Sequence, residues 1–291
     1  MYRNSARWIL FSFMAALLLW MMLYSFLVSI VHPRSGYIAA VSPQEYTERF
    51  RGFSPEPRDA ITVLFMGVEG LRAPPDVYLL ARFDPAQGTV ALTAIPGNMQ
   101  VLNEGRPESL AQVYTFGGVQ YTRDLLAAEL GIGIDRFVRL TPESFVASAS
   151  VIGSVQFSLP EAITVIQDGV SLELREGLQL LDGRRALQVL RHRYGDGGQR
   201  LDVLARLSAE IIEQRRDVVL SAVIDNIFER IINIIDSDIS YADYIVRKPA
   251  AEYFARLPGP VTHIVAFSGV REEGRIIAAD TYIAQVRRYF G

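Results

Sequence analysis

A single apolar segment near the start of the chain, Trp8–Val31, limits the architectures open to this protein more than any other feature. It contains 24 consecutive residues without a charge and is rich in Leu, Met, Phe and Trp. A helix rises about 1.5 Å per residue, so the segment is long enough to cross a hydrocarbon core of roughly 30 Å. We therefore predict a transmembrane helix followed by a body that folds on one side of the membrane.

The residues around this segment favour an uncleaved anchor over a cleaved signal peptide. A signal peptide has an apolar core of roughly 7–15 residues and a small-x-small cleavage site, and Leu23–Arg34 fits neither description. Arg3 and Arg7 precede the span and Arg34 follows it, which weakly favours an inner N-terminus. The expected localisation is the cell membrane, single-pass, with the N-terminus inside and the domain extracytoplasmic.

The composition argues against several kinds of site. The chain has no Cys, so neither a disulfide framework nor a thiolate metal site can form, and His32, His192 and His263 are scattered, which argues against zinc. A net charge of −3 leaves no global basic field for nucleic-acid binding. Lys248 is the only lysine, so the position of the arginines is more informative than their number.

The body of the chain predicts an α/β domain. Turn-rich chain up to Arg58 is typical of a linker. The expected boundaries are 1–34 for the N-terminus and anchor, 35–58 for the linker, and 59–291 for the domain, with a core at 59–216 and a C-terminal extension at 217–291. About 255 residues after the anchor suffice for one large core.

Strand and helix patterns alternate along this body. Apolar, β-branched runs at 61–68, 77–83 and 89–95 predict three strands of one sheet, the last two joined by a hairpin turn at Asp84–Gly88. Their order with the helical segments indicates a sheet covered by helices on its faces. The further elements expected are strands at 136–140, 154–159 and 260–267, and helical segments at 110–131, 141–152, 182–190, 201–216, 218–235, 241–257 (with a break at Pro249) and 278–290.

Six arginines gather between Arg184 and Arg206. The planar guanidinium fork suits bidentate contact with phosphate, so we interpret the segment as half of a phosphate site. Arg191 and Arg193 would point to one side of an extended segment and His192 to the other, so His192 is not proposed as a general base. Arg206 would lie one turn inside the next helix, able to face back. The alternative is a set of solvated surface arginines paired with Asp182, Asp196 and Asp202.

The order of short motifs behind a single anchor resembles the LytR–CpsA–Psr (LCP) family. The resemblance covers roughly 61–216 and extends loosely to the end of the chain. The motifs that carry it are Val63–Glu69, Asp76–Leu80, Leu92–Pro96, Val113–Gly118, Gly131–Val138, Leu181–Leu187, Arg191–Arg193 and Arg206.

This resemblance implies an αβα sandwich with a mixed central sheet and an apolar pocket for a lipid tail. It implies transfer of a glycopolymer from a polyprenyl-diphosphate carrier to peptidoglycan, usually with Mg²⁺. The implied partners are that lipid-linked glycan, peptidoglycan and the membrane, and no nucleic acid. Displacement at phosphorus depends chiefly on positioning and charge neutralisation, which arginines and a carboxylate-held divalent ion can supply.

The resemblance also assigns candidate site residues. Asp76 is the best-placed metal ligand, with capping of the next strand as its alternative role, and the two aromatic candidates have a plain core role as theirs. The candidates are Arg191, Arg193 and Arg206 for catalysis, Arg72, Arg200, Tyr114 and Phe116 for substrate binding, and Asp76 and Asn98 for the metal.

The chain departs from the family pattern at several of these positions. The family usually has Ile-Pro-Arg-Asp after its third strand, whereas this chain has Ile95–Asn98 and lacks both the arginine and the carboxylate. Ser109, Ala111 and Gln112 replace a basic residue and polar partners, Leu207 follows Arg206 where glutamine is common, and Val203 stands where arginine is usual. Removing one charged donor from a transition state often costs several kcal/mol. Three hypotheses stay open: an active transferase, a weak or inactive relative that binds the glycolipid or wall polymer, and a scaffold for protein contact.

Overall fold

The structure is a computed structural model that describes residues 53–291 apart from 71–72, 168–169, 196, 221–223 and 273–274. The predicted anchor lies outside the described residues. Within them, no helix combines the length and the hydropathy needed to cross a bilayer. The chain divides into two compact units at the bond between Phe53 and Ser54. The fold described below is that of the second unit, Ser54–Gly291.

The described residues build a mixed six-stranded sheet. Its strands are β1 (Ile61–Gly67), β2 (Val77–Asp84), β3 (Thr89–Pro96), β6 (Arg136–Leu140), β11 (Asp236–Ser237) and β12 (Thr262–Ile264), in the order β11-β6-β1-β2-β3-β12. β1, β2 and β3 form an antiparallel meander, whereas β6 pairs parallel with β1 and β12 parallel with β3. The predicted hairpin is confirmed, since Asp84 pairs with Thr89.

One face of this sheet is packed solidly against α3 (Leu110–Leu130) and α9 (Asp280–Phe290). Because side chains alternate across a strand, Tyr78 and Leu80 of β2 both point to this face, and both are fully buried. Ser109 caps α3 in a reciprocal arrangement with Gln112, which satisfies two donors at the helix start. α3 ends at Gly131, whose φ of 67° lies in the left-handed region.

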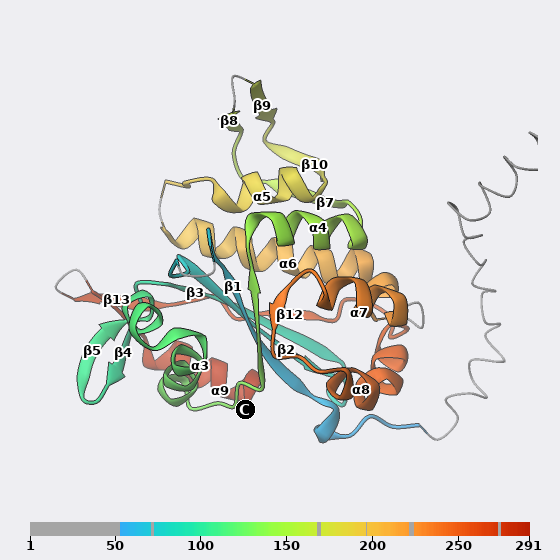
Figure 1. The fold of residues 1–291 in the computed structure, drawn as a ribbon, viewed down its shortest axis with the longest axis horizontal. Helices are drawn as coiled ribbons and strands as arrows, with labels where there is room; N and C mark the ends of the chain where they lie inside the picture. Colours follow the sequence, from blue (N-terminus) through green and yellow to red (C-terminus); the bar gives the residue numbers. More distant parts are fainter. Residues whose placement is uncertain (1–52, 71–72, 168–169, 196, 221–223, 273–274) are drawn as a thin grey trace, which may run out of the picture. The chain divides into compact units, whose positions relative to one another are not determined.

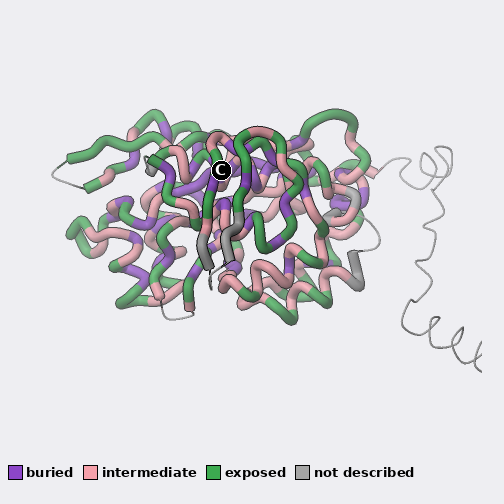
Figure 2. Tube along the Cα trace, turned by 90° about the horizontal axis from the view of Figure 1, so that it is seen from above, coloured by how far each residue is buried: buried purple, intermediate pink, exposed green. Residues whose placement is uncertain are grey.

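The opposite face lies under α4 (Pro142–Ile152), α5 (Gly183–Arg191), α6 (Gly197–Leu220) and α7 (Ile224–Ile232), so helices flank both sides of the sheet (Figure 1). The predicted αβα arrangement with a mixed central sheet is therefore confirmed for the described residues. From Val77 to Leu80 of β2, partly exposed positions alternate with buried ones. Figure 2 colours buried residues purple and partly exposed ones pink. Val77 and Leu79 of β2 face these helices.

Short paired strands and one further helix complete the domain. α8 (Tyr241–Phe254) follows β11 and lies at the same end of the sheet as α7 (Figure 1). The remaining elements are η1 (Pro57–Asp59), and the pairs β4 (Gln100–Asn103) with β5 (Arg106–Ser109), β7 (Val155–Leu159) with β10 (Gly177–Leu181), β8 (Ile163–Gln167) with β9 (Val170–Leu174), and β13 (Gly269–Glu272) with β14 (Arg275–Ala278).

The C-terminal third corrects four predictions. α6 begins four residues before the predicted 201 and continues to Leu220, and the stretch expected as one helix at 218–235 contains the end of α6 and the separate α7. The break expected at Pro249 is wrong, because α8 continues through it with Pro249 on its exposed side. The last strand is shorter than expected, covering Thr262–Ile264.

Candidate functional site

A cavity of about 570 Å³ separates the sheet from the helices above it. Its walls are mainly Leu, Ile, Val, Phe and Ala side chains, contributed by the sheet and by α4, α5, α6 and α7. Val63 and Phe65 of β1 and Leu79 of β2 point into it, each one position away from a residue packed on the other face. A volume of this size falls in the usual range for small-molecule sites.

One end of the cavity is polar. β1 ends there and leads to Glu69, β2 begins there just after Asp76, α5 ends at Arg191, and the first turn of α6 carries Arg200. All four side chains line the cavity. An apolar chamber therefore ends at two guanidinium groups and two carboxylates.

The four charges are arranged as two ion pairs. Arg191 donates from Nε to Oε1 of Glu69 at 3.0 Å, and its Nη2 also contacts Oε2. Arg200 Nη1 lies 3.5 Å from Oδ2 of Asp76. The carboxylates are well exposed, at 68% for Glu69 and 79% for Asp76. Exposed pairs of this kind are worth about 0–1 kcal/mol, so an anionic ligand can displace the carboxylates.

Arg200 is also held by the backbone. Its Nε donates to the carbonyl oxygen of Leu190 at 3.2 Å. This bond ties the start of α6 to the last turn of α5, and it leaves Nη1 directed at the mouth. Arg200 was expected to be a substrate-binding residue, and the structure places it at the mouth beside Arg191.

The other arginines of the cluster do not line the cavity. Arg206 lies six positions after Arg200 on α6, a rotation of about 240° around a helix. It pairs with Asp202 at 2.7 Å and lies 5.6 Å from the ring of Phe157. This placement corrects the expectation that Arg206 faces back toward the other arginines and fits the surface-pair alternative. Arg193 is exposed and follows the helix end instead of sharing an extended segment with Arg191, and Arg72 lies outside the described residues.

Tyr114 and Phe116 are not part of the cavity wall. Tyr114 is buried in the core on the opposite face of the sheet and accepts a hydrogen bond from Arg139 at 3.1 Å. Phe116 is 80% exposed. The core alternative therefore fits Tyr114, whereas Phe116 takes neither of the roles considered for it.

Asp76 and Asn98 lie in neighbouring segments. The Gly97 N–H donates to the carbonyl oxygen of Asp76 at 2.7 Å, and a Cβ at Gly97 would come within 2.4 Å of the Pro75 oxygen. Only glycine fits this approach, and it brings Asn98 next to the Asp76 segment. The side chain of Asn98 is exposed and does not line the cavity.

The mouth has the donor types that Mg²⁺ accepts. Mg²⁺ is usually held by one or two carboxylates together with substrate phosphates and water, and Asp76 and Glu69 supply two carboxylates. Among the described residues, no group of three His, Cys, Asp or Glu side chains is placed to hold a metal ion. Glu69 was not singled out from the sequence. An acidic residue two positions after a strand that ends in glycine is the signal that could have found it.

His192 is directed away from the mouth. Its Nε2 lies 2.9 Å from Oε1 of Glu161, and the Tyr194 ring packs edge-on at 4.8 Å. These contacts agree with leaving His192 out of the proposed chemistry. They bind the segment after α5 to the start of the β8 and β9 pair.

The fold is therefore that of an α/β protein with an apolar chamber that ends in a charged mouth, a shape that suits an amphiphile with an anionic head. The profile of the LytR_cpsA_psr family matches residues 31–250. The match includes more than half of the chain, and the chain belongs to this family.

The relatives agree with this membership. The chain is 26% identical over 172 residues to the polyisoprenyl-teichoic acid–peptidoglycan teichoic acid transferase TagU of Bacillus subtilis (strain 168), which covers 57% of this chain and 55% of that protein. The chain spans about half the length of the curated relatives it matches. The named relatives are polyisoprenyl-teichoic acid–peptidoglycan teichoic acid transferases.

Solved structures show the same fold. The chain superposes on Bacillus subtilis TagV with a TM-score of 0.65 and 21% identity, covering 79% of this chain and 95% of that one. It superposes on TagT bound to LI-WTA with a TM-score of 0.61 and 18% identity, covering 82% and 92%. These likenesses establish the architecture.

Proposed function

We propose that this protein is a membrane-anchored phosphotransferase that moves a glycopolymer from a polyprenyl-diphosphate carrier to peptidoglycan. The observation that carries the proposal is the apolar cavity that ends at Arg191 and Arg200. Membership of the family and its likeness to TagU support the same reaction class.

The cavity suits the lipid tail of such a carrier. It follows β1 from Ile61 to Glu69, and seven strand residues extend about 23 Å at about 3.3 Å each. A tail of several isoprene units fits along this length. Burying apolar surface contributes about 25 cal/mol per Å², so the tail supplies affinity while the head stays at the mouth.

The mouth suits the diphosphate. Arg191 and Arg200 would exchange their carboxylate partners for phosphate oxygens and neutralise charge on the nonbridging oxygens. An acceptor hydroxyl oxygen would attack the phosphorus that carries the glycan, and the bridging P–O bond would break. Polyprenyl phosphate would leave with the electron pair of that bond, and the hydroxyl proton would pass to solvent. Such displacement depends mainly on positioning and charge.

Carboxylates freed from the arginines could hold a divalent cation. We propose that Asp76 and Glu69 hold Mg²⁺ together with the diphosphate, and that Asn98 adds an uncharged oxygen nearby. A bound cation of this kind would neutralise further charge on the phosphoryl oxygens.

The proposed localisation is the outer side of the cell membrane. The Trp8–Val31 segment would anchor the chain with its N-terminus inside. Peptidoglycan and the lipid-linked polymer would then reach the domain from the same side.

A binding role without turnover is the second candidate, and the Pro96–Asn98 segment favours it. Gly97 is packed against the Asp76 segment where the family usually has an arginine, and Asn98 stands where a carboxylate is usual. Two partners that would stabilise the transition state are therefore missing. Binding depends on the cavity and on Arg191 and Arg200, which are present.

Turnover and binding can be separated with one substrate. The full chain in detergent is incubated with a polyprenyl-diphosphate-linked saccharide, Mg²⁺ and peptidoglycan fragments, and released polyprenyl phosphate is measured. Arg191→Ala should reduce release at least a hundredfold, whereas Arg184→Ala on the same helix, exposed and outside the cavity wall, should not. Binding without release would favour the second candidate, and absence of both would contradict the proposal.

A further inference from the structure

α8 presents an apolar surface to the outside. All of α8 lies among the described residues, and each of its exposed positions carries an apolar or aromatic side chain. Tyr241, Ile245 and Val246 are 58%, 44% and 60% exposed. An ordinary surface helix has polar residues on its outer side. The α8 face, defined as Tyr241, Ala242, Ile245, Val246 and Pro249, has the reverse pattern.

The positions of these residues form a regular stripe. Ala242, Ile245, Val246 and Pro249 follow the spacing i, i+3, i+4, i+7, which places them on one side of a helix. The other side of α8 packs inward through Tyr244 and neighbouring residues of the same helix. α8 therefore has two apolar sides, and the domain covers one of them.

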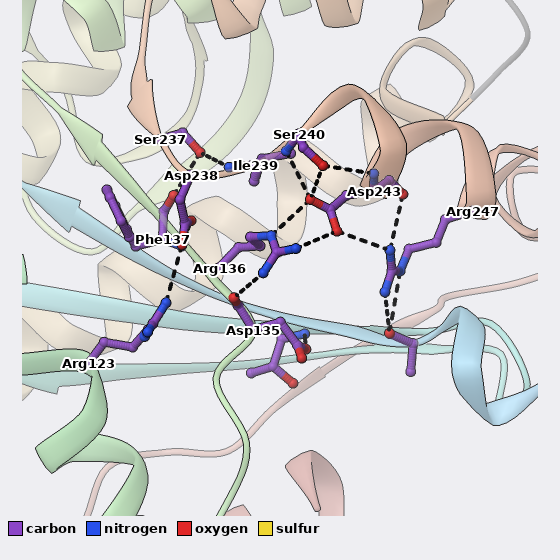
Figure 3. A network of polar contacts seen from close by, with 12 residues as sticks. Arg123, Asp135, Arg136, Phe137, Ser237, Asp238, Ile239, Ser240, Asp243 and Arg247 are labelled. Carbon is purple, nitrogen blue, oxygen red and sulfur yellow. Dashed lines mark hydrogen bonds and ion pairs between the residues drawn. The ribbon is translucent and has the colours of Figure 1, made fainter. Parts of the chain in front are cut away.

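Polar contacts fix α8 in place. Asp243 accepts two hydrogen bonds from Arg136 of β6, both at 2.8 Å, and one from the Ser240 hydroxyl at 2.7 Å (Figure 3). Arg247 reaches the carbonyl oxygen of Ala60 at 3.4 Å. The outward face thus belongs to a firmly held helix, not to a frayed end.

The same contacts place α8 beside the start of the domain. Ala60 lies between η1 and β1, so the first elements of the domain lie next to α8. The predicted membrane span ends at Val31, immediately before residues 32–53. The apolar face and the predicted anchor are therefore joined by a short stretch of chain.

The cavity reaches the same end of the domain. Opposite the arginines its wall includes Ile61, together with Ile231 of α7 and Ile235. Phe228 of α7 stacks on Tyr244 of α8 with ring centroids 4.5 Å apart. One helix thus contacts both the inner end of the cavity and α8. The tail of a lipid whose head lies at the mouth would point toward this end.

We propose that the α8 face docks on the lipid bilayer, with its apolar side chains among the headgroups and upper acyl chains. Amphipathic helices that lie on membranes bury their apolar side about 5–10 Å into this region, and tyrosines such as Tyr241 favour it. Arg230, in the last turn of α7, is exposed and would supply a cation for anionic lipids. The inference rests on the proposed anchoring and adds a second membrane contact at the tail end of the cavity.

The absence of cysteine allows a direct test. An environment-sensitive fluorophore is attached to Val246→Cys in the full chain, which is reconstituted in phosphatidylcholine–phosphatidylglycerol vesicles with or without lipids that carry a quencher on the acyl chain. The matched site is Leu178→Cys on β10, which is 68% exposed. We expect quenching at 246 several-fold stronger than at 178, and we expect Ile245→Glu to reduce it toward the value at 178.

Each other outcome overturns the docking. Equal quenching at positions 246 and 178, in protein that floats with the vesicles, would contradict docking of the α8 face. The proposed N-terminal anchor would not be affected by that result. A blue shift at 246 that ignores the lipid quencher and fades when the protein is diluted in the vesicles would show that a second copy covers the face. The quenching assay contains no substrate and does not depend on transfer. If quenching is normal but the separate transfer assay shows no polymer transfer, that result counts against the proposed function alone.

Discussion

Arg191 and Glu69 are 122 positions apart in the chain and meet across the mouth of the cavity, with Nε of the arginine 3.0 Å from Oε1 of the glutamate. The helix α5 brings the first residue and the strand β1 leads to the second. The arginine proposed to bind the lipid headgroup is therefore already occupied by a carboxylate. A ligand has to compete with it.

Glu69→Gln should therefore strengthen binding of an anionic head in the absence of divalent ions. The exposed pair is worth at most about 1 kcal/mol, so the gain should be no more than about fivefold. Titration calorimetry with polyprenyl monophosphate in EDTA measures it, with the exposed Glu176→Gln as control. Weaker binding than wild type would show that Glu69 supports the site instead of competing for it.

Arg200 and Arg206 give opposite expectations although they lie on the same helix. Arg200 lines the mouth, whereas Arg206 is paired with Asp202 away from it. Hydrogen bonds to a charged group contribute about 1.5–3 kcal/mol, so Arg200→Ala should weaken binding of polyprenyl monophosphate at least tenfold. Arg206→Ala should change it less than twofold. The same calorimetric titration decides, and a reversed order would return Arg206 to the site.

The sequence predicted the strands β1, β2, β3, β6 and β12 and most helices, because strand and helix periodicity are local signals. The arginine cluster, also a local signal, includes Arg191 and Arg200, which line the mouth. The sequence could not rank Arg200 above Arg206, since the rotation of α6 depends on where that helix begins, and it begins four residues before the predicted start. Glu69 escaped notice because its role depends on α5 returning to the end of β1. Tyr114 was misplaced because nothing in the sequence says which face of the sheet α3 covers.

Neighbouring leucines on β2 should differ in their effect on stability. Leu80 is fully buried in the packed core, whereas Leu79 borders the cavity. Leu80→Ala should cost about 2–5 kcal/mol through lost contacts and a new void. Leu79→Ala should cost about half of that or less, because the side chain already faces empty space. Urea unfolding in detergent, followed by circular dichroism, compares them, and equal costs would contradict an open cavity at Leu79.

Asp243 should make the domain sensitive to acid. Burial alone raises the pKa of this carboxyl, but the hydrogen bonds from Arg136 and Ser240 together outweigh it and hold the pKa at about 2. A folded-state pKa below the unfolded value stabilises the fold above the unfolded pKa, near 4 for aspartate. This stabilisation is lost as pH falls from about 4 to about 2.

Asp243→Asn should therefore be less stable than wild type at neutral pH, by about 1–3 kcal/mol, and the difference should shrink as pH falls through this window. Urea unfolding at a series of pH values measures the difference, and the exposed Asp124→Asn serves as the control, with little expected change. A difference that stayed constant from pH 7 to pH 2 would show that the carboxylate charge is not what binds α8 to β6. In that case packing of Tyr244 and its neighbours, together with the Arg247 contact to Ala60, would hold the α8 face, and acid would leave membrane docking unchanged.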